Sequence, residues 1–253
     1  MRIARIDAPG LGPTWAVLED DLAVPTDGPQ GRRRGEPVPL AGARWLPASA
    51  PRTVMAVGLN YRSHAAETGR EPPAAPGVFL KAVTTLAPHQ GRIEYPPSTQ
   101  DLHFEGELAV VIGRGGRDIP PDRARDHVLG YTCAIDATAR DLQRRDLQWF
   151  RGKSYDTFCP LGPWIETGFD PAAGMLTTRI NDQQRQHSPT SDMIFDVPYL
   201  IAHVSSVVTL APGDVLLTGT PAGVGPLQIG DRIEVEISGI GTLTASVVAR
   251  PAS

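Results

Sequence analysis

The sequence predicts an α+β fold dominated by strands, with a small β unit at the N-terminus and a few helices. Glycine and proline make up about one-fifth of the 253 residues, with 26 Gly and 25 Pro, which favours short strands joined by many turns over a helical bundle. The apolar, β-prone segments are short, and several end at a glycine. No apolar run reaches the ~18 residues that a membrane span requires.

The composition indicates an ordered protein that binds neither nucleic acid nor membranes. Hydrophobic residues make up 41% and charged residues 21% of the chain, which excludes bulk disorder. The net charge of −4 argues against nucleic-acid binding, which needs a basic surface. Cys133 and Cys159 are too few for a disulfide framework and no signal peptide is evident, so we expect a cytoplasmic location.

Lysine is rare in this chain. Of the 24 basic residues, only Lys81 and Lys153 are lysines, and all the others are arginines. A position that keeps lysine in such a chain is a candidate for a role that needs a compact ammonium group. Two surface lysines without a specific role are an equally good interpretation.

The predicted elements divide the chain into two parts. Strands at 2–7 and 14–18 form a small β unit, and the Pro-, Gly- and Arg-rich stretch that follows predicts a solvated linker, so we assign 1–50 to this unit and 51–253 to the main domain. In the main domain, strands are predicted at 53–59, 78–81, 104–112, 131–135, 215–218, 232–237 and 242–248. Helices are predicted at 62–68, 122–128, 136–148 and 198–210, the last with Asp196 as N-cap.

Two glutamates lie at the start of the predicted strand 104–112. Because side chains alternate between faces along a strand, Glu105 and Glu107 point to the same side, whereas Leu108 faces the core. Two carboxylates on one face repel each other, so they either face water, as charges on an edge strand do, or share a cation. The pair alone favours the water-facing arrangement.

Asp136 adds a third carboxylate. It follows the predicted strand 131–135 and begins the predicted helix 136–148, on which Asp136, Arg140 and Gln143 share one face. Such a row suits a charged, oxygen-rich ligand, although an N-cap aspartate with an ordinary ion pair is the simpler interpretation of these residues by themselves. Three carboxylates without a cysteine or histidine cluster favour a hard cation, Mg²⁺ or Mn²⁺.

His64 and Glu67 are three residues apart and therefore neighbours on the predicted helix 62–68. A carboxylate beside an imidazole fixes its tautomer and raises its basicity, as the activation of water requires. Surface pairs at this spacing are common. The flanking Gly58, Asn60 and Gly69, however, are typical of a short helix on a movable lid.

Two further segments are candidates for ligand binding. Lys153 lies in the polar segment 151–157. Gly219 and Thr220 lie in the Gly-rich loop 218–225, which follows a predicted buried strand. Such loops present main-chain N–H groups that can bind a carboxylate. The loop lacks the Gly-Lys-Ser/Thr ending of a phosphate-binding loop, and an ordinary turn is an equally good interpretation.

These motifs follow one another in a definite order within 53–248. The set consists of Gly58-Leu59-Asn60-Tyr61 with His64 and Glu67, Phe79-Leu80-Lys81, Glu105-Gly106-Glu107-Leu108, Asp136 with Arg140-Asp141, Gly152-Lys153, and Pro212-Gly213-Asp214 with Thr218-Gly219-Thr220-Pro221. In this order the set resembles the fumarylacetoacetate hydrolase family. The resemblance implies a mixed β-sandwich roll for a catalytic domain at 51–253, a homodimer, and Mg²⁺ or Mn²⁺ in the active site.

The resemblance also implies roles for individual residues. By position, the metal ligands correspond to Glu105, Glu107 and Asp136. The catalytic dyad on the lid corresponds to His64 and Glu67, and the lysine beside the reacting oxyanion corresponds to Lys153. The substrate-binding positions correspond to Arg140, Gln143, Gly219 and Thr220. Lys81 lies in a stretch typical of the family but receives no chemical step.

The resemblance is to the short bacterial branch of the family. This branch includes acylpyruvate and fumarylpyruvate hydrolases, oxaloacetate decarboxylases, and isomerases or decarboxylases of homoprotocatechuate breakdown, a catabolism of aromatic compounds. It implies Mg²⁺-dependent hydrolysis of a carbon–carbon bond in a 2,4-dioxo acid through a metal-bound enolate. A decarboxylase, or an isomerase or tautomerase of 2-hydroxy-diene-dioates, is the alternative because the same enolate serves each reaction. A non-catalytic binding protein with the same fold is an alternative from another class.

Overall fold

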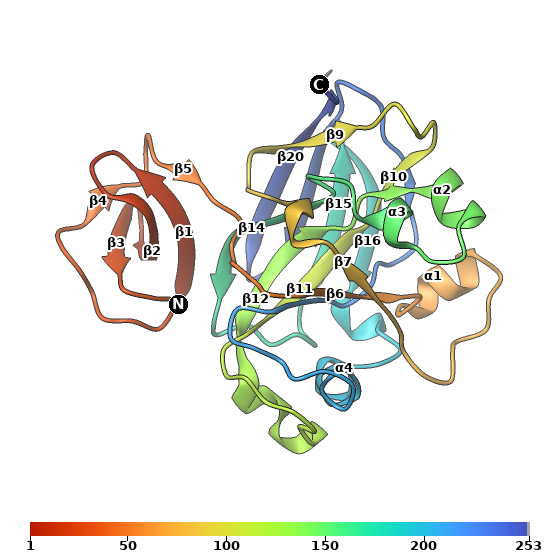
Figure 1. The fold of residues 1–253 in the computed structure, drawn as a ribbon, viewed down its shortest axis with the longest axis horizontal. Coiled ribbons are helices and arrows are strands. Elements are labelled where there is room, and N and C mark those ends of the chain that lie inside the picture. The colour runs from red at the N-terminus through yellow and green to blue at the C-terminus, as the bar shows by residue number, and fades with distance from the viewer. Residues whose placement is uncertain (252–253) are drawn as a thin grey trace.

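The computed structural model describes residues 1–251, and most of its regular structure is strand. Strands account for 43% of the residues and helices for 15%. The strands form sheets of 12, 3 and 5 strands. The predicted β-dominated α+β class is therefore confirmed (Figure 1).

The largest sheet extends from the N-terminal unit through the middle of the main domain. Its strands are β1 (Arg2–Ala8), β2 (Gly12–Glu19), β3 (Leu22–Thr26), β4 (Val38–Pro39), β5 (Arg44–Trp45), β6 (Val54–Gly58), β7 (Gly77–Lys81), β8 (Leu86–Ala87), β11 (Gly106–Ile112), β12 (Val128–Ile135), β14 (Cys159–Glu166) and β17 (Val215–Leu217). Their order is β4-β3-β2-β1-β14-β12-β11-β17-β6-β7, with β5 paired to β1 and β8 to β14.

A second sheet packs on the main-domain half of the first. It consists of β9 (Gly91–Tyr95), β15 (Met175–Ile180), β16 (Gln183–Pro189), β19 (Arg232–Ile237) and β20 (Gly241–Ala249), in the order β16-β15-β19-β20-β9. Side chains of both sheets, such as Leu108, Leu176 and Val235, belong to one buried apolar cluster. The small third sheet contains β10 (Leu102–Phe104), β13 (Thr138–Ala139) and β18 (Gly225–Pro226). The main domain is thus a β sandwich, and β11 and β12 lie at its centre (Figure 1).

Strand β11 is buried on both faces. Leu108 and Val110 pack in the cluster between the sheets, and Ala109 and Val111 pack in a second cluster on the opposite face. The water-facing interpretation of the glutamate face is therefore wrong. It assumed an edge strand, whereas β11 is hydrogen-bonded to β12 on one side and to β17 on the other.

The helices are few and short. They are α1 (Arg62–Glu67), α2 (Arg140–Arg145), α3 (Phe150–Lys153) and α4 (Val197–Ser205), with 3₁₀ turns at Val83–Thr85, Pro121–His127 and Thr190–Asp192. Asp196 is the N-cap of α4, and its Oδ1 accepts from the Tyr199 N–H at 2.9 Å, as predicted. Within the described residues, no helix has the length and apolar character to cross a membrane.

The predicted helix 136–148 is wrong in its extent. Asp136 directly follows the last residue of β12. Its N–H donates to the Glu105 carbonyl at 2.9 Å, which extends the pairing of β12 with β11 by one residue. The short strand β13 follows, so the helix begins only at Arg140. Asp136 and Arg140 therefore do not share a helix face, and the Arg140 side chain bonds to Glu105 instead.

The N-terminal strands lie to one side of the main domain (Figure 1). They join it through β1, which pairs with β14 at Arg2 opposite Glu166 and Ile3 opposite Ile165. Trp45 of β5 contacts the His89 ring edge-on, with the ring centroids 5.3 Å apart. The first sheet therefore continues from the N-terminal unit into the main domain without interruption.

Candidate metal centre and active site

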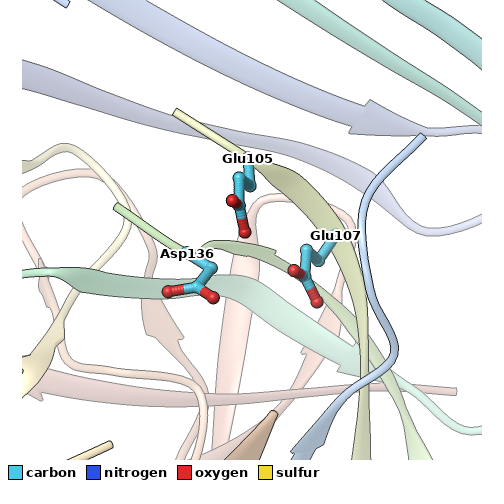
Figure 2. A group of neighbouring side chains, drawn as sticks. All are labelled: Glu105, Glu107 and Asp136. Carbon is cyan, nitrogen blue, oxygen red and sulfur yellow. The ribbon is translucent and has the colours of Figure 1, made fainter. Parts of the chain in front are cut away.

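Three carboxylates that are distant in sequence converge at the centre of the main domain. Figure 2 shows the side chains of Glu105, Glu107 and Asp136 turned toward a common space. One carboxylate oxygen from each lies within 4.8 Å of the others, and all three residues are buried. The pairing of β11 with β12 sets this geometry, because it places Gly106 opposite Ile135, the residue before Asp136. The predicted convergence of the three acidic residues is thus present.

Gly106, between the two glutamates, allows the second sheet to approach closely. A Cβ atom at this position would lie 2.2 Å from Thr178 Oγ1 on β15. The Gly106 N–H donates to Gln186 Oε1 at 3.0 Å, and its carbonyl accepts from Thr220 Oγ1 at 2.9 Å. The backbone that carries Glu105 and Glu107 is therefore held by the second sheet and by the Gly-rich loop.

Three cations face the three carboxylates. Lys153 Nζ donates to Glu105 Oε2 at 2.8 Å and to Asp136 Oδ2 at 2.6 Å. Lys81 Nζ donates to Asp136 Oδ1 at 2.5 Å, and an Arg140 N–H donates to Glu105. Burial lowers the pKa of Lys153, but Asp136 and Glu105 outweigh burial and raise it above the ordinary value. Lys153 is therefore an ammonium ion at neutral pH.

The negative charge of the site is unevenly compensated. Burial raises the pKa of Glu105, but Arg140 and Lys153 outweigh burial and hold that pKa well below its ordinary value. Burial and the charges of Asp136 and Glu105 raise the pKa of Glu107 well above its ordinary value. Glu107 accepts the Gly219 N–H at 2.7 Å, a neutral donor. Additional positive charge would therefore be most stabilising beside Glu107.

A divalent cation fits this arrangement of side chains. All three donors are carboxylate oxygens, which hard ions such as Mg²⁺ and Mn²⁺ prefer. Burial makes uncompensated carboxylates unfavourable, and an ion between them would relieve their mutual repulsion. Glu105, Glu107 and Asp136 are thus the residues that would hold it.

His64 and Glu67 form a hydrogen-bonded pair on α1. His64 Nδ1 lies 3.0 Å from Glu67 Oε2. Because a carboxylate accepts, this contact assigns the proton to Nδ1 and leaves Nε2 as a lone-pair acceptor. Glu67 Oε1 also accepts the Gly223 N–H at 2.9 Å, which ties the helix to the Gly-rich loop. The predicted dyad is therefore assembled and oriented.

A cavity of about 310 Å³ brings the dyad and the carboxylate cluster together. Six of the ten residues predicted for the site line it: His64, Glu105, Arg140, Gln143, Lys153 and Thr220. The other four, Glu67, Glu107, Asp136 and Gly219, are bonded to members of this group or to one another. All ten predicted residues therefore belong to one continuous site.

Other residues of the site were not predicted from the sequence. The cavity is also lined by Phe79, Arg70, His103, Arg144 and Trp149. Gln186 on β16 donates to Thr220 Oγ1 at 2.8 Å and accepts from Gly106. Phe79 belongs to one of the ordered motifs but was given no role. No local pattern marks Arg70, Arg144 or Gln186, because arginine is common throughout the chain and Gln186 lies in a polar strand.

Two family models match the chain. The model described as "Rv2993c-like, N-terminal" matches residues 1–47, and the model described as "Fumarylacetoacetate (FAA) hydrolase C-terminal" matches residues 53–248. The chain belongs to the fumarylacetoacetate hydrolase family. The carboxylate cluster, the dyad and Lys153 all lie within the part that matches this family.

Relatives within the fumarylacetoacetate hydrolase family are named for different reactions. The mitochondrial oxaloacetate decarboxylase of Dictyostelium discoideum is 44% identical, over 76% of this chain and 91% of the relative. The crystal structure of 5-carboxymethyl-2-hydroxymuconate delta-isomerase from Mycobacterium smegmatis has a TM-score of 0.93 and 43% identity, covering 99% of this chain and 100% of that chain. The crystal structure of fumarylpyruvate hydrolase from Pseudomonas aeruginosa, in complex with Mn²⁺ and pyruvate, has a TM-score of 0.76 and 35% identity. It covers 80% of this chain and 91% of that chain. This is therefore a family of enzymes that includes at least three reaction types.

Proposed function

We propose that this chain is a Mg²⁺- or Mn²⁺-dependent enzyme that hydrolyses a carbon–carbon bond in a 2,4-dioxo acid of the acylpyruvate class. The observation that carries the proposal is the buried carboxylate cluster, which faces Lys153 in the same cavity as His64. Held by Glu105, Glu107 and Asp136, the ion would supply a Lewis acid for the 2-oxo carboxylate end of the substrate. The fumarylpyruvate hydrolase named above, in complex with Mn²⁺ and pyruvate, supports this choice.

The cationic side chains bind and stabilise the substrate. Lys153, with its ammonium group between Glu105 and Asp136, places positive charge beside the oxygen on which negative charge develops. Arg140 and Gln143 bond to each other at 2.8 Å and face the cavity, so they contact the substrate as a unit. Thr220 lines the same cavity from the Gly-rich loop, and Gly219 holds Glu107 through its N–H.

The dyad performs the proton transfer. His64 takes a proton from water at Nε2 while Glu67 holds Nδ1. The resulting hydroxide attacks the C4 carbonyl, and the C3–C4 bond breaks with its electron pair left on C3 as the enolate of pyruvate. A proton returned to C3 completes pyruvate, and the C4 fragment leaves as a carboxylic acid. One water is consumed for each bond that is broken.

Decarboxylation and isomerisation or tautomerisation are the second candidates for this site. Both need the same stabilised enolate, and neither needs the attack of water. The decarboxylase and isomerase relatives described above favour these reactions. A non-catalytic binding protein would have no use for three buried carboxylates with three cationic partners, because burying charged groups is unfavourable even when they are paired.

The experiment is a product screen in the presence and absence of Mg²⁺. Acetylpyruvate, fumarylpyruvate, oxaloacetate and a 2-hydroxy-diene-dioate are incubated with the protein, and products are identified by proton NMR. We expect pyruvate and a second acid from an acylpyruvate, dependent on Mg²⁺ and lost in Glu105→Ala. If only oxaloacetate or the dioate is turned over, decarboxylation or isomerisation replaces hydrolysis as the proposed reaction. If none of the four compounds is turned over, both proposals are contradicted.

We also propose that the chain is a cytoplasmic homodimer. The strand β7 ends the first sheet, and it exposes Val78 and Leu80 beside Val207 and Val208, which follow α4. An exposed apolar patch on an edge strand is typical of an interface, and a second copy would cover it. Sedimentation of the parent protein and of Leu80→Glu tests this proposal. We expect the parent to be a dimer and Leu80→Glu to be a monomer. A parent that sediments as a monomer would contradict the proposal.

A further inference from the structure

Lys81 is a buried lysine that the proposed reaction does not use. It is the last residue of β7, whose side chains alternate between two environments. Val78 and Leu80 point outward and are 38% and 57% exposed, whereas Lys81 points inward and is 3% exposed. Phe79, on the inward side, lines the cavity. Lys81 is not among the described residues that line this cavity, and its ammonium group is bonded to Asp136 and to the main chain of Lys153.

The ammonium group of Lys81 joins two functional residues. Its Nζ donates to Asp136 Oδ1 at 2.5 Å and to the main-chain carbonyl of Lys153. Lys153 Nζ in turn donates to Asp136 Oδ2 at 2.6 Å. Each oxygen of the Asp136 carboxylate is thus held by a different lysine. The three residues come from β7, from the end of β12 and from the end of α3, so Lys81 links three separate elements.

The inward face of β7 also positions the Lys153 side chain. Lys153 Nζ lies 5.0 Å from the centre of the Phe79 ring, within the range of a cation–π contact. Phe79 therefore contacts the ammonium end of Lys153, and Lys81 binds the carbonyl at its main-chain end. Together these contacts hold Lys153 in one orientation.

Burial of an ammonium group is unfavourable unless it is fully paired, and an apolar residue of similar length would fill the same space without that cost. The side chain of Lys81 is 0% exposed and that of Asp136 1% exposed. The chain contains only two lysines, and both are bonded to the same carboxylate. Stability alone therefore does not explain the charge at position 81.

We propose that Lys81 is a positioning residue, which fixes the Asp136 carboxylate and anchors the main chain of Lys153 so that the Lys153 ammonium reaches the reacting oxygen. This inference rests on the proposed function. The role is specific to lysine because a compact ammonium can donate in diverging directions, whereas a guanidinium group is planar and larger. Lys81 acts through Asp136 and Lys153 and takes no proton from the substrate.

A structural and a positioning role differ in their effect on metal binding. Lys81, Lys153 and Arg140 balance the three carboxylates, so removal of Lys81 leaves the cluster with an excess negative charge. That excess strengthens the attraction for a divalent cation. Loss of the Lys153 anchor, in contrast, slows turnover. A substitution that only disorders the site would weaken both metal binding and turnover.

The test is Lys81→Met, which keeps the length of the side chain and removes its charge. Arg179→Met is the matched control, because it removes a cation from a half-buried ion pair with Glu236 on the second sheet, outside the site. The dissociation constant for Mn²⁺ is measured by electron paramagnetic resonance, and kcat and KM are measured with acetylpyruvate and with oxaloacetate. Lys81→Gln is measured in the same way in case the Met variant does not fold.

We expect Lys81→Met to lower kcat by about 10- to 100-fold, the usual effect of losing a partner of a metal ligand, while Mn²⁺ binds at least as tightly as in the parent. Arg179→Met should retain the kcat of the parent. A kcat within threefold of the parent, or Mn²⁺ binding weakened by more than threefold, would overturn the inference while leaving the proposed function intact. A parent that binds no Mn²⁺ and turns over neither substrate would instead overturn the proposed function, and the role of Lys81 with it.

Discussion

His64 and the carboxylate cluster perform separable tasks. His64 lines the cavity and is oriented by Glu67, whereas the cluster is buried on the face of β11 that points away from the second sheet. Because His64 is not a ligand in the proposed metal site, proton transfer and metal binding should respond to different substitutions.

The substitution His64→Asn tests this separation. We expect turnover to fall by roughly 10²- to 10⁴-fold, the usual contribution of a general base, while Mn²⁺ affinity measured by calorimetry stays within twofold of the parent. Glu67→Gln, which keeps a hydrogen-bonding partner for the ring, should lose less activity. A His64→Asn variant with normal turnover would show that another group activates water.

Individual residues also show how far the sequence predicts the site. The alternation of side chains along a strand correctly placed Glu105 and Glu107 on one side. The order of the motifs predicted that Asp136 and Lys153 lie in the same site. Lys81 and Gln186 could not be assigned in this way. Their partners, Asp136 and Gly106, are 55 and 80 residues away in sequence, and no local periodicity records such contacts.

Among the elements, strands with regular patterns were predictable and irregular ones were not. Predicted strands at 215–218, 232–237 and 242–248 correspond to β17, β19 and β20. No strand was predicted at β14, whose sequence contains Pro160, Gly162 and Pro163, or at β16, which is polar along most of its length. In both strands, pairing with neighbours outweighs a weak local preference.

A buried side chain at the base of helix α1 connects it to two other segments. Asn60 Nδ2 donates to the carbonyls of Thr218 at 2.8 Å and Phe195 at 3.0 Å, and Asn60 Oδ1 accepts the Phe195 N–H at 2.8 Å. This buried amide therefore joins the start of α1 to the Gly-rich loop and to the segment before α4.

Asn60→Ala removes these three bonds and leaves their main-chain partners unpaired. We expect the free energy of unfolding, measured with urea, to fall by roughly 3 kcal/mol, and turnover to fall as well because α1 carries His64. The exposed control Arg92→Ala should change neither quantity. Unchanged stability in Asn60→Ala would mean that water replaces the amide without cost.

In the whole molecule, the contact between the N-terminal unit and the main domain includes a half-buried histidine. His89 contacts Trp45 of the N-terminal unit, and its Nδ1 accepts the Thr244 N–H at 3.2 Å. Burial lowers the pKa of His89 to about 4, from an ordinary value of ~6.5. The folded protein therefore keeps His89 neutral at a pH at which the unfolded chain protonates it.

This pKa difference predicts acid sensitivity. Between pH 6.5 and about 4 the unfolded state binds a proton at His89 that the folded state does not bind. The contribution of His89 to the free energy of unfolding is therefore complete above pH 6.5 and is lost as the pH falls. We expect the decrease in Tm between pH 7 and pH 5 to be smaller in His89→Asn, which keeps an acceptor for Thr244, by at least about 2 °C. An equal decrease in parent and variant would exclude His89 as a source of the pH dependence.

We propose that Glu105, Glu107 and Asp136 together bind one divalent cation. The most direct measurement is a calorimetric titration of Mn²⁺ into the parent and into Glu107→Gln, which keeps the size of the side chain and removes its charge. We predict one Mn²⁺ per chain in the parent and no measurable binding in the variant. Equal binding in both proteins, or none in the parent, would contradict the claim.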